Sequence, residues 1–246
     1  MDELQDEFFA SIESRVDIFE ARNPTAAIKG LRFPRVPIAV IIMDGLKPRT
    51  EAHKALLTAL LGYAKNEPGI VIFAFGFPSF QIPPDIAEVF ETFGVYWSRS
   101  NYSREMFHLN NARVAPSDRE VLKSGKGDSS ATATAGKELG ALQELIRDSG
   151  QILAPSYSMK ALQLSGVSAE DAVYVYERDL IKKPKGRVKE NRLVDAAVAL
   201  TRVGKGRVAY IGDVNSESMT ELLVRAMIGL EPGSPRTDRQ LTVQLS

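Results

Sequence analysis

Two runs of β-branched and aromatic residues constrain the fold more than any other feature of this sequence. They cover residues 38–43 and 70–75. Neither run alternates between apolar and polar residues, which is typical of strands covered on both faces of a parallel sheet. A helical stripe follows the first run (Leu56, Leu57, Leu60 and Leu61), and a second helix is expected between Pro83 and Gly94. Strand, helix, strand, helix predicts a parallel sheet with helices on its faces.

We therefore predict an α/β fold, specifically a three-layer α/β/α sandwich with a mostly parallel central sheet, flavodoxin-like or amidotransferase-like. Residues 95–110, 152–167 and 172–176 are expected to be extended. An antiparallel hairpin is expected near the carboxyl end, because residues 194–200 and 206–212 flank a Gly-Lys turn. No repeat and no shift in composition divides residues 1–246, so a single domain is predicted.

The remaining segments carry weaker patterns. Residues 1–22 predict an amphipathic N-terminal helix, which could pack on the domain or support a homodimer. Residues 115–136 predict a flexible polar loop, and a short helix is expected after it, at 137–148. A last helix should start at Ser218, with Glu221 at capping-box spacing, and end at Gly229. Residues 232–246 predict a loose tail.

Composition excludes several classes of chemistry. The 246 residues include no cysteine, which excludes disulfides, thiolate metal sites and a cysteine nucleophile. Lysine plus arginine balances aspartate plus glutamate at 31 each, so nucleic acid is not an expected partner, although residues 182–192 are locally basic. The longest apolar run is too short for a bilayer, and residues 2–7 are acidic, unlike a leader; a cytoplasmic protein is expected.

Three strand ends carry residues suited to a site. Ligands of open α/β sheets bind beyond the carboxyl ends of the strands. The segments that should converge there are Asp44-Gly45, Gly76-Phe77-Pro78-Ser79 and Asp213-Val214-Asn215. We expect Asp44 and Asp213 to end adjacent strands and to border one cavity.

Several short motifs resemble the class I glutamine amidotransferase superfamily, especially its ThuA-like and uncharacterised fungal members. They are the strand and turn at residues 70–79, the phrase Tyr-Ser-Met-Lys-Ala at 157–161, and the segment Gly-Asp-Val-Asn-Ser-Glu at 212–217. The resemblance extends loosely over residues 37–230 and implies the same fold. In that superfamily a cysteine lies on the turn after a central strand, and a histidine and a glutamate follow a late strand.

This chain lacks the residues of that thiol relay. The nucleophile turn corresponds to Gly76-Phe77, so an aromatic ring stands in place of sulfur, and no histidine is present near Asp213. A thiolate nucleophile also needs a base. We therefore expect no glutaminase activity, and we expect Phe77 to fill the crevice together with Phe75, Phe80 and Trp97.

Two classes of function remain open. One is a pseudoenzyme that binds a small molecule or a partner protein in the crevice. The other is a divergent hydrolase, lyase or isomerase, such as a step of secondary metabolism. The only histidines are His53, expected to face solvent, and His108, which follows an aromatic stretch. No metal or cofactor is expected, since the carboxylates form no ligand pattern. The candidate catalytic residues are Asp44, Asp213 and His108, and the candidate binding residues are Gly45, Gly76, Phe77, Ser79, Tyr102, Arg104 and Asn215.

Overall fold

The strands of the described chain form one nine-stranded mixed sheet. The computed structural model describes residues 3–32, 35–81, 83–110, 153–180, 192–230 and 239–244. The strand order is β1-β9-β2-β3-β8-β7-β5-β4-β6. The strands are β1 (Asp17–Ala21), β2 (Ala39–Ile42), β3 (Ile70–Phe73), β4 (Ser98–Leu109), β5 (Ser156–Ser168), β6 (Ala172–Tyr176), β7 (Leu193–Val203), β8 (Gly206–Ile211) and β9 (Gln240–Gln244).

Five strands make the parallel half of the sheet. β1, β9, β2, β3 and β8 run in the same direction, with Val40 opposite Val71 and Val71 opposite Val208. Every residue of β2 and β3 is buried. The two doubly apolar runs are therefore neighbouring central strands, as predicted.

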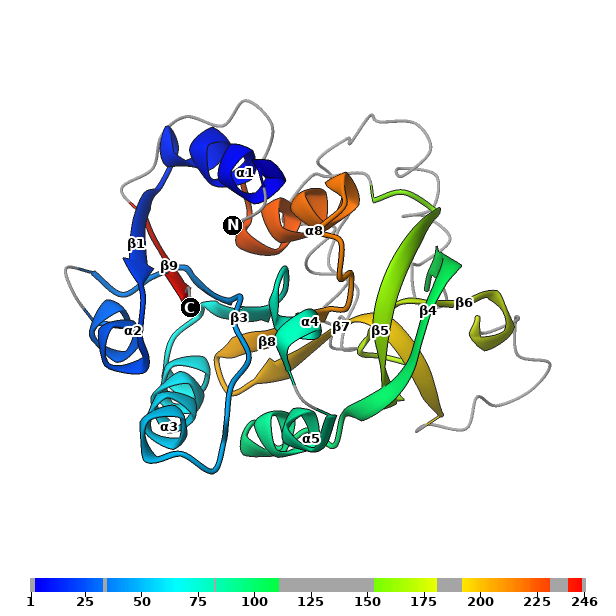
Figure 1. Ribbon diagram of the computed structural model, residues 1–246, viewed down its shortest axis with the longest axis horizontal. Helices are drawn as coiled ribbons and strands as arrows, with labels where there is room; N and C mark the ends of the chain where they lie inside the picture. Colours follow the sequence, from blue (N-terminus) through cyan, green and yellow to red (C-terminus); the bar gives the residue numbers. More distant parts are fainter. Residues whose placement is uncertain are drawn as a thin grey trace, which may run out of the picture.

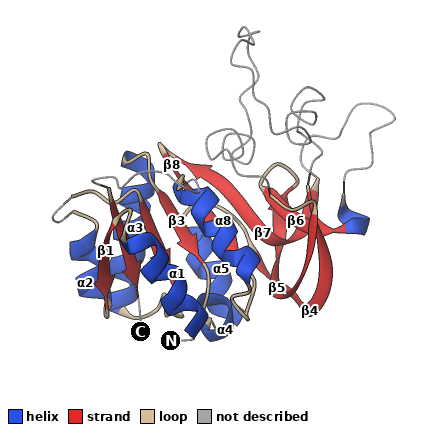
Figure 2. Cartoon of the chain, turned by 90° about the horizontal axis from the view of Figure 1, so that it is seen from above, coloured by secondary structure: helices blue, strands red, loops and turns tan. Residues whose placement is uncertain are grey.

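Helices cover both faces of this parallel half (Figures 1 and 2). On one face, α1 and α8 share a buried cluster with alternate residues of β2 and β3. On the other face, α2, α3 and α5 share a second cluster with the residues in between. The helices are α1 (Glu3–Glu13), α2 (Pro24–Gly30), α3 (Glu51–Asn66), α4 (Phe77–Phe80), α5 (Pro83–Thr92) and α8 (Ser218–Ile228), with a short 3-10 helix η2 (Glu177–Asp179).

The antiparallel half is larger than expected from the sequence. β7 pairs with β8 across Gly204, whose φ of 63° suits glycine. β7 also pairs with β5 and β6, while β4 pairs with both β5 and β6, so these four strands close into a ring. Closure follows from strand length, because β4 and β5 have 12 and 13 residues and each bends along more than one partner.

Gly212 lies at the corner where β5, β7 and β8 meet. Its N–H donates to Ala197 O (2.8 Å), and its carbonyl accepts from Leu162 N (2.9 Å). A Cβ at this position would lie 2.1 Å from Leu162 O. Only glycine lets these backbones approach so closely.

Both ends of the chain differ from the prediction. The expected helix over residues 1–22 ends at Glu13, and Asp17–Ala21 form β1, because Ile18 and Phe19 pair alongside β9. Asn23 does not end a helix; its side chain caps α2 by accepting from Ala26 N (2.8 Å). The expected loose tail contains β9, which lies between β1 and β2. The side chains of its residues 240–243 are buried on both faces, so it belongs to the central sheet.

Several helix predictions are confirmed. Thr50 caps α3, and Gly229 ends α8 with a φ of 69°. The expected capping box at Ser218 and Glu221 does not form, because Glu217 is the N-cap and makes no side-chain cap bond. The predictions for residues 115–136, 137–148 and all but Arg192 of the basic segment 182–192 lie outside the described residues. Among the helices described, none is long and apolar enough to cross a bilayer.

Candidate functional site

The turn after β3 carries a strained residue. Phe75 has a φ of 57°, in the left-handed region that bulky residues avoid. In the described chain only one other non-glycine residue has a positive φ, namely Ser216 (φ 53°), which follows β8. β3 and β8 are neighbouring parallel strands, so both strained residues lie at one edge of the sheet. Strain of this kind tends to cluster at functional sites.

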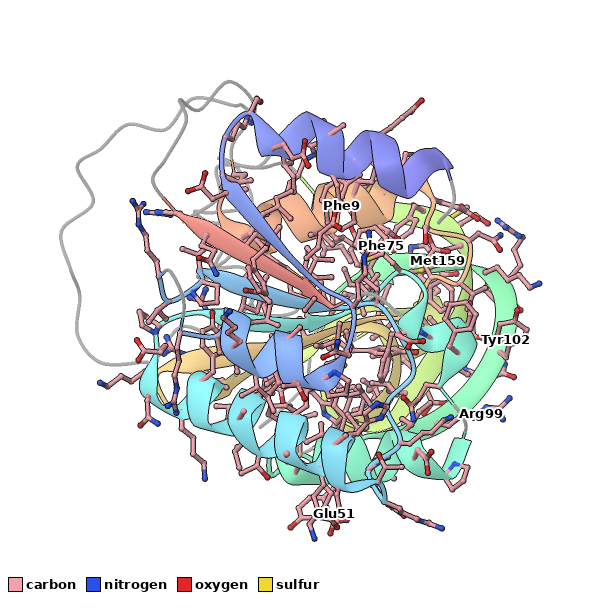
Figure 3. The ribbon with its side chains drawn as sticks, turned by 60° about the vertical axis from the view of Figure 1, so that its left-hand side comes forward. Phe9, Glu51, Phe75, Arg99, Tyr102 and Met159 are labelled. Atoms are coloured by element: carbon pink, nitrogen blue, oxygen red, sulfur yellow. The ribbon has the colours of Figure 1, made fainter. Side chains whose placement is uncertain are left out.

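α1 covers the strained turn. Phe75 is only 1% exposed, and its ring centroid lies 5.5 Å from that of Phe8 and 5.8 Å from that of Phe9. Figure 3 shows Phe9 on α1 directly beside Phe75, with Met159 of β5 nearby. The residue just before the Gly76-Phe77 turn that the resemblance aligns with a nucleophile is therefore covered by aromatic rings.

Phe77 does not have the role that the sequence predicted. It is buried in the cluster on the opposite face of the sheet, 4.9 Å from Phe73. Trp97 belongs to the same opposite cluster, and Phe80 is 65% exposed. Strict alternation would put Phe75 on the same face as Phe73. The left-handed φ of Phe75 interrupts the alternation after β3 ends, so Phe75 lies with Ala74 in the cluster on the α1 face. Phe75, and not Phe77, fills the crevice on the α1 side.

The three predicted strand exits do converge. The side chain of Gln81, just after α4, accepts from Leu46 N (2.7 Å) and donates to Leu46 O (2.8 Å). On the other side, the Ser79 hydroxyl donates to Val214 O (3.4 Å). These bonds join the exits of β2, β3 and β8 into one surface.

Gly45 and Gly76 serve this close packing. A Cβ on Gly45 would lie 2.6 Å from Phe80 O, and a Cβ on Gly76 would lie 2.6 Å from Met43 O. The two glycines predicted as binding residues are thus needed where backbones approach each other.

Asp213 anchors the start of α8. Its carboxylate is fully buried and accepts three hydrogen bonds. Oδ1 accepts from Asn215 N (3.0 Å), and Oδ2 accepts from Glu217 N (2.7 Å) and from the Thr220 hydroxyl (2.8 Å). Glu217 N is the N-cap donor that the side chain of Glu221 would satisfy in a capping box, so Asp213 takes over this part of the missing capping box.

Burial raises the pKa of Asp213 above its ordinary value of 3.8, while its three donors act in the opposite direction. A raised carboxyl pKa is also found in general acids, so the protonation behaviour alone does not distinguish a cap from a catalyst. The geometry does distinguish them, because both carboxylate oxygens of Asp213 already accept hydrogen bonds from the chain's own donors.

Asp44 lies apart from Asp213. β3 separates their strands, so the prediction that these strands are adjacent is wrong. Two strand spacings amount to about 9.6 Å. Asp44 Oδ1 accepts from Gly45 N (2.8 Å), and its charge acts on His53, whose Nδ1 accepts from Lys47 N (2.6 Å). Burial, the largest cause, lowers the pKa of half-buried His53, whereas Asp44 acts to raise it.

The outer face of β4 and β5 contributes three more polar groups. Arg104 forms an ion pair with Glu217 (2.6 Å), and Lys160 lies 5.2 Å from the Tyr102 ring centroid. The Asn215 amide also reaches Glu217 (3.4 Å). Tyr102, Arg104 and Asn215, predicted as binding residues, thus lie beside the exit of β8.

His108 lies away from this edge. Ala161 of β5 bridges to Asp213 and pairs with Ser103 of β4. His108 is five residues further along β4, about 17 Å at 3.4 Å per residue. The structure does not bring His108 together with Asp44 and Asp213.

Several residues at this edge were missed from the sequence. Tyr157 lies on β5, and burial, followed by the charge of Asp213, raises its pKa well above the ordinary value. Its hydroxyl donates to Met159 Sδ (3.1 Å). Phe8 belongs to the apolar stripe of the predicted N-terminal helix and Phe9 does not, and nothing local shows which strand exit a distant helix covers. The pair Phe75-Gly76 after an apolar run was the one available signal for the strained turn.

Other site chemistry is sparse in the part of the chain that the structure describes. No three His, Asp or Glu side chains there gather into a group that could hold a metal ion. A cavity of about 340 Å³ lies at the opposite, amino edge of β2 and β3, between Ile38, Ile70, Met227 and two arginines, Arg207 and Arg239. It is separate from the predicted crevice.

Comparison with known proteins identifies no relative: no family model, no curated protein and no solved structure matches the chain. The resemblance to amidotransferase-like proteins therefore rests on the short sequence motifs alone.

Proposed function

We propose that this chain is a cysteine-free, amidotransferase-like α/β/α sandwich protein without glutaminase activity, which binds a partner protein at the carboxyl edge of its sheet. The single observation that carries the proposal is the environment of Phe75. Phe75 directly precedes the Gly76-Phe77 turn that the resemblance aligns with a nucleophile, and its phenyl ring is buried beneath α1.

The surrounding groups support the absence of thiol chemistry. Asp213, the only acid at the exit of β8 that is fully buried, is engaged by three donors of its own loop and helix. The histidine nearest the strand exits, His53, accepts a backbone hydrogen bond beside β2. In the part of the chain that the structure describes, the rings beside Phe75 are those of Phe8 and Phe9, and neither can take a proton from a nucleophile.

Exposed apolar side chains on the same edge support binding. We define the edge patch as Phe80, Tyr102, Arg104, Met106 and Lys160. Three of the seven large apolar side chains exposed in the described chain belong to it: Phe80 at 65%, Met106 at 50% and Tyr102 at 46%. Aromatic residues, methionine and arginine are the types enriched in protein interfaces.

Strand pairing and backbone hydrogen bonds connect the residues of the edge patch. Tyr102, Arg104 and Met106 alternate along one face of β4, and Arg104 pairs with Lys160 across β5. Lys160 O accepts from Val214 N (3.0 Å), and Val214 O accepts from Ser79, the neighbour of Phe80. The mixture of apolar side chains with the Arg104–Glu217 ion pair favours a protein surface over a small apolar ligand.

The experiment is an affinity capture from the native host with purified chain, comparing wild type with Phe80→Ser/Met106→Ser. The matched control is Leu193→Ser, because Leu193 is an equally exposed apolar residue (63%) outside the edge patch. We expect one set of proteins to be retained by wild type and by the control and to be lost by the double variant.

Thermal unfolding of all three proteins must be equal, since the substituted side chains are exposed. A set of captured proteins that is the same for the double variant as for wild type would show that the edge patch binds nothing. A thermal-shift screen tests whether small molecules bind instead. A compound that raises the Tm of the double variant as much as that of wild type would bind outside the edge patch.

A further inference from the structure

α1 is attached to the rest of the molecule mainly through a few apolar side chains. Phe8 and Ile12 are buried in the cluster on its face of the sheet, and Phe9 packs against that cluster. From α8, Arg225 donates to the Ser11 hydroxyl (2.5 Å) and lies 5.1 Å from the Phe8 ring centroid. Figure 1 shows α1 lying beside α8 above the sheet.

The chain after α1 can bend without disturbing the sheet. The N–H groups of Arg15 and Val16 both donate to Ile12 O, which closes the helix. Asp17 N then donates to Arg239 O, and β1 pairs with β9 over its whole length. Val16 is itself buried in the core cluster, so the link between the helix held by side chains and the strand held by backbone hydrogen bonds is Ser14-Arg15.

The residue beneath α1 is one of the two strained residues of the described chain. A phenylalanine with a φ of 57° persists only where its surroundings hold it. The rings of Phe8 and Phe9 supply part of that surrounding, so contact with α1 and the conformation of Phe75 are coupled.

We propose that α1 is a displaceable lid over the exit of β3. It swings away about Ser14 and Arg15 while Val16 and the nine-stranded sheet stay in place, and it uncovers the ring of Phe75 and the neighbouring side of α8. Closed, it makes this exit inaccessible to ligands; open, it offers an apolar groove beside the strained turn. The lid is independent of the edge patch, which contains no residue of α1.

The absence of cysteine from the sequence allows a direct test, because an introduced cysteine is the sole thiol. Phe75→Cys places the thiol beneath α1. Phe77→Cys is the matched control: the same residue type, two positions away and equally buried, but in the cluster on the other face. Both purified full-length variants are reacted with a thiol reagent under native conditions and at increasing urea concentrations.

We expect Phe75→Cys to react at least about tenfold faster than Phe77→Cys, with a weaker dependence on urea, because partial opening exposes less surface than global unfolding. Adding Arg225→Ala should accelerate Phe75→Cys roughly two- to fivefold by removing the contact with Phe8, and should leave Phe77→Cys nearly unchanged.

Equal rates and equal urea slopes for the two thiols would overturn the lid, since both would then react only through global unfolding. If Phe75→Cys fails to fold, Phe8→Cys replaces it, because Phe8 is buried on the lid itself. The same comparison with Phe77→Cys then decides, with faster reaction supporting the lid and equal reaction refuting it. Neither outcome depends on whether a partner protein binds.

Discussion

Replacing Asp213 by alanine should destabilise the fold, because this carboxylate organises the start of α8. The substitution leaves Asn215 N, Glu217 N and the Thr220 hydroxyl without their acceptor. Thr220 is fully buried, whereas Asn215 is exposed and can be hydrated.

The magnitude follows from these three bonds. Loss of a helix cap costs about 1 kcal/mol, and a buried donor left without a partner costs about 1–3 kcal/mol. Burial of the carboxylate, which raises the pKa of Asp213, offsets part of that loss when the charge is removed. We expect a net loss of about 2–3 kcal/mol in the free energy of unfolding, and hence a Tm lowered by roughly 4–12 °C in a chain of this size.

The measurement is thermal unfolding by circular dichroism, with Asp44→Ala as the matched control. Asp44 is partly exposed and accepts one bond, from Gly45 N, so its loss should cost under about 1 kcal/mol. An Asp213→Ala protein whose Tm stays within a degree of wild type would refute the structural role and would return Asp213 to the candidate catalytic residues.

Three further perturbations have defined outcomes. Phe77→Ala should cost about 3 kcal/mol or more in urea unfolding, as truncation of a fully buried phenylalanine does; a near-parental midpoint would show an exposed ring. Gly212→Ala should prevent folding or lower the free energy of unfolding by about 3 kcal/mol or more, since its Cβ would lie 2.1 Å from Leu162 O. Gly62→Ala is the control: it has open space around it in α3, so it should raise the free energy of unfolding by about 0.5–1 kcal/mol. The pKa of Asp213 is raised in the folded state, so the stability that this shift contributes is complete below the unfolded-state pKa and is lost as pH rises through the folded-state pKa. In urea titrations, the free energy of unfolding of wild type should therefore exceed that of Asp213→Asn by more near pH 4 than at pH 7. A difference that does not change with pH would contradict the raised pKa.

The parallel half of the fold was predictable because its signal is local. The runs that became β2 and β3 are apolar on both faces, and the caps Thr50 and Gly229 mark helix ends by their own chemistry. Each of these patterns needs no knowledge of distant residues.

The predictions that were wrong concern strands whose pairing partners lie far away in the sequence. β9 is a short strand whose place between β1 and β2 is set by partners more than 190 residues away. The ring of β4, β5, β6 and β7 likewise depends on long-range pairing that alternation cannot show. Short segments take their conformation from such contacts more than from their own propensity.

The candidate site was predicted in outline and not in detail. The strand-exit rule correctly brought the loops of Asp44, Ser79 and Asp213 together. It could not show that Phe75 and not Phe77 faces α1, because alternation puts both on one face and only the left-handed φ of Phe75 moves it to the other. Nor could it show that Asp213 is a helix cap, since that depends on the donors around it.

The most direct test of the proposed absence of thiol chemistry is ammonia release from glutamine, measured with purified wild type and with Phe75→Cys. Phe75→Cys places a thiol at the strained turn, next to Gly76-Phe77, but supplies no base beside it. We predict that neither protein releases ammonia above a heat-killed control. Ammonia release by wild type would contradict the proposed function. Ammonia release by Phe75→Cys would show that a group at the exit of β3 can accept the proton of the thiol.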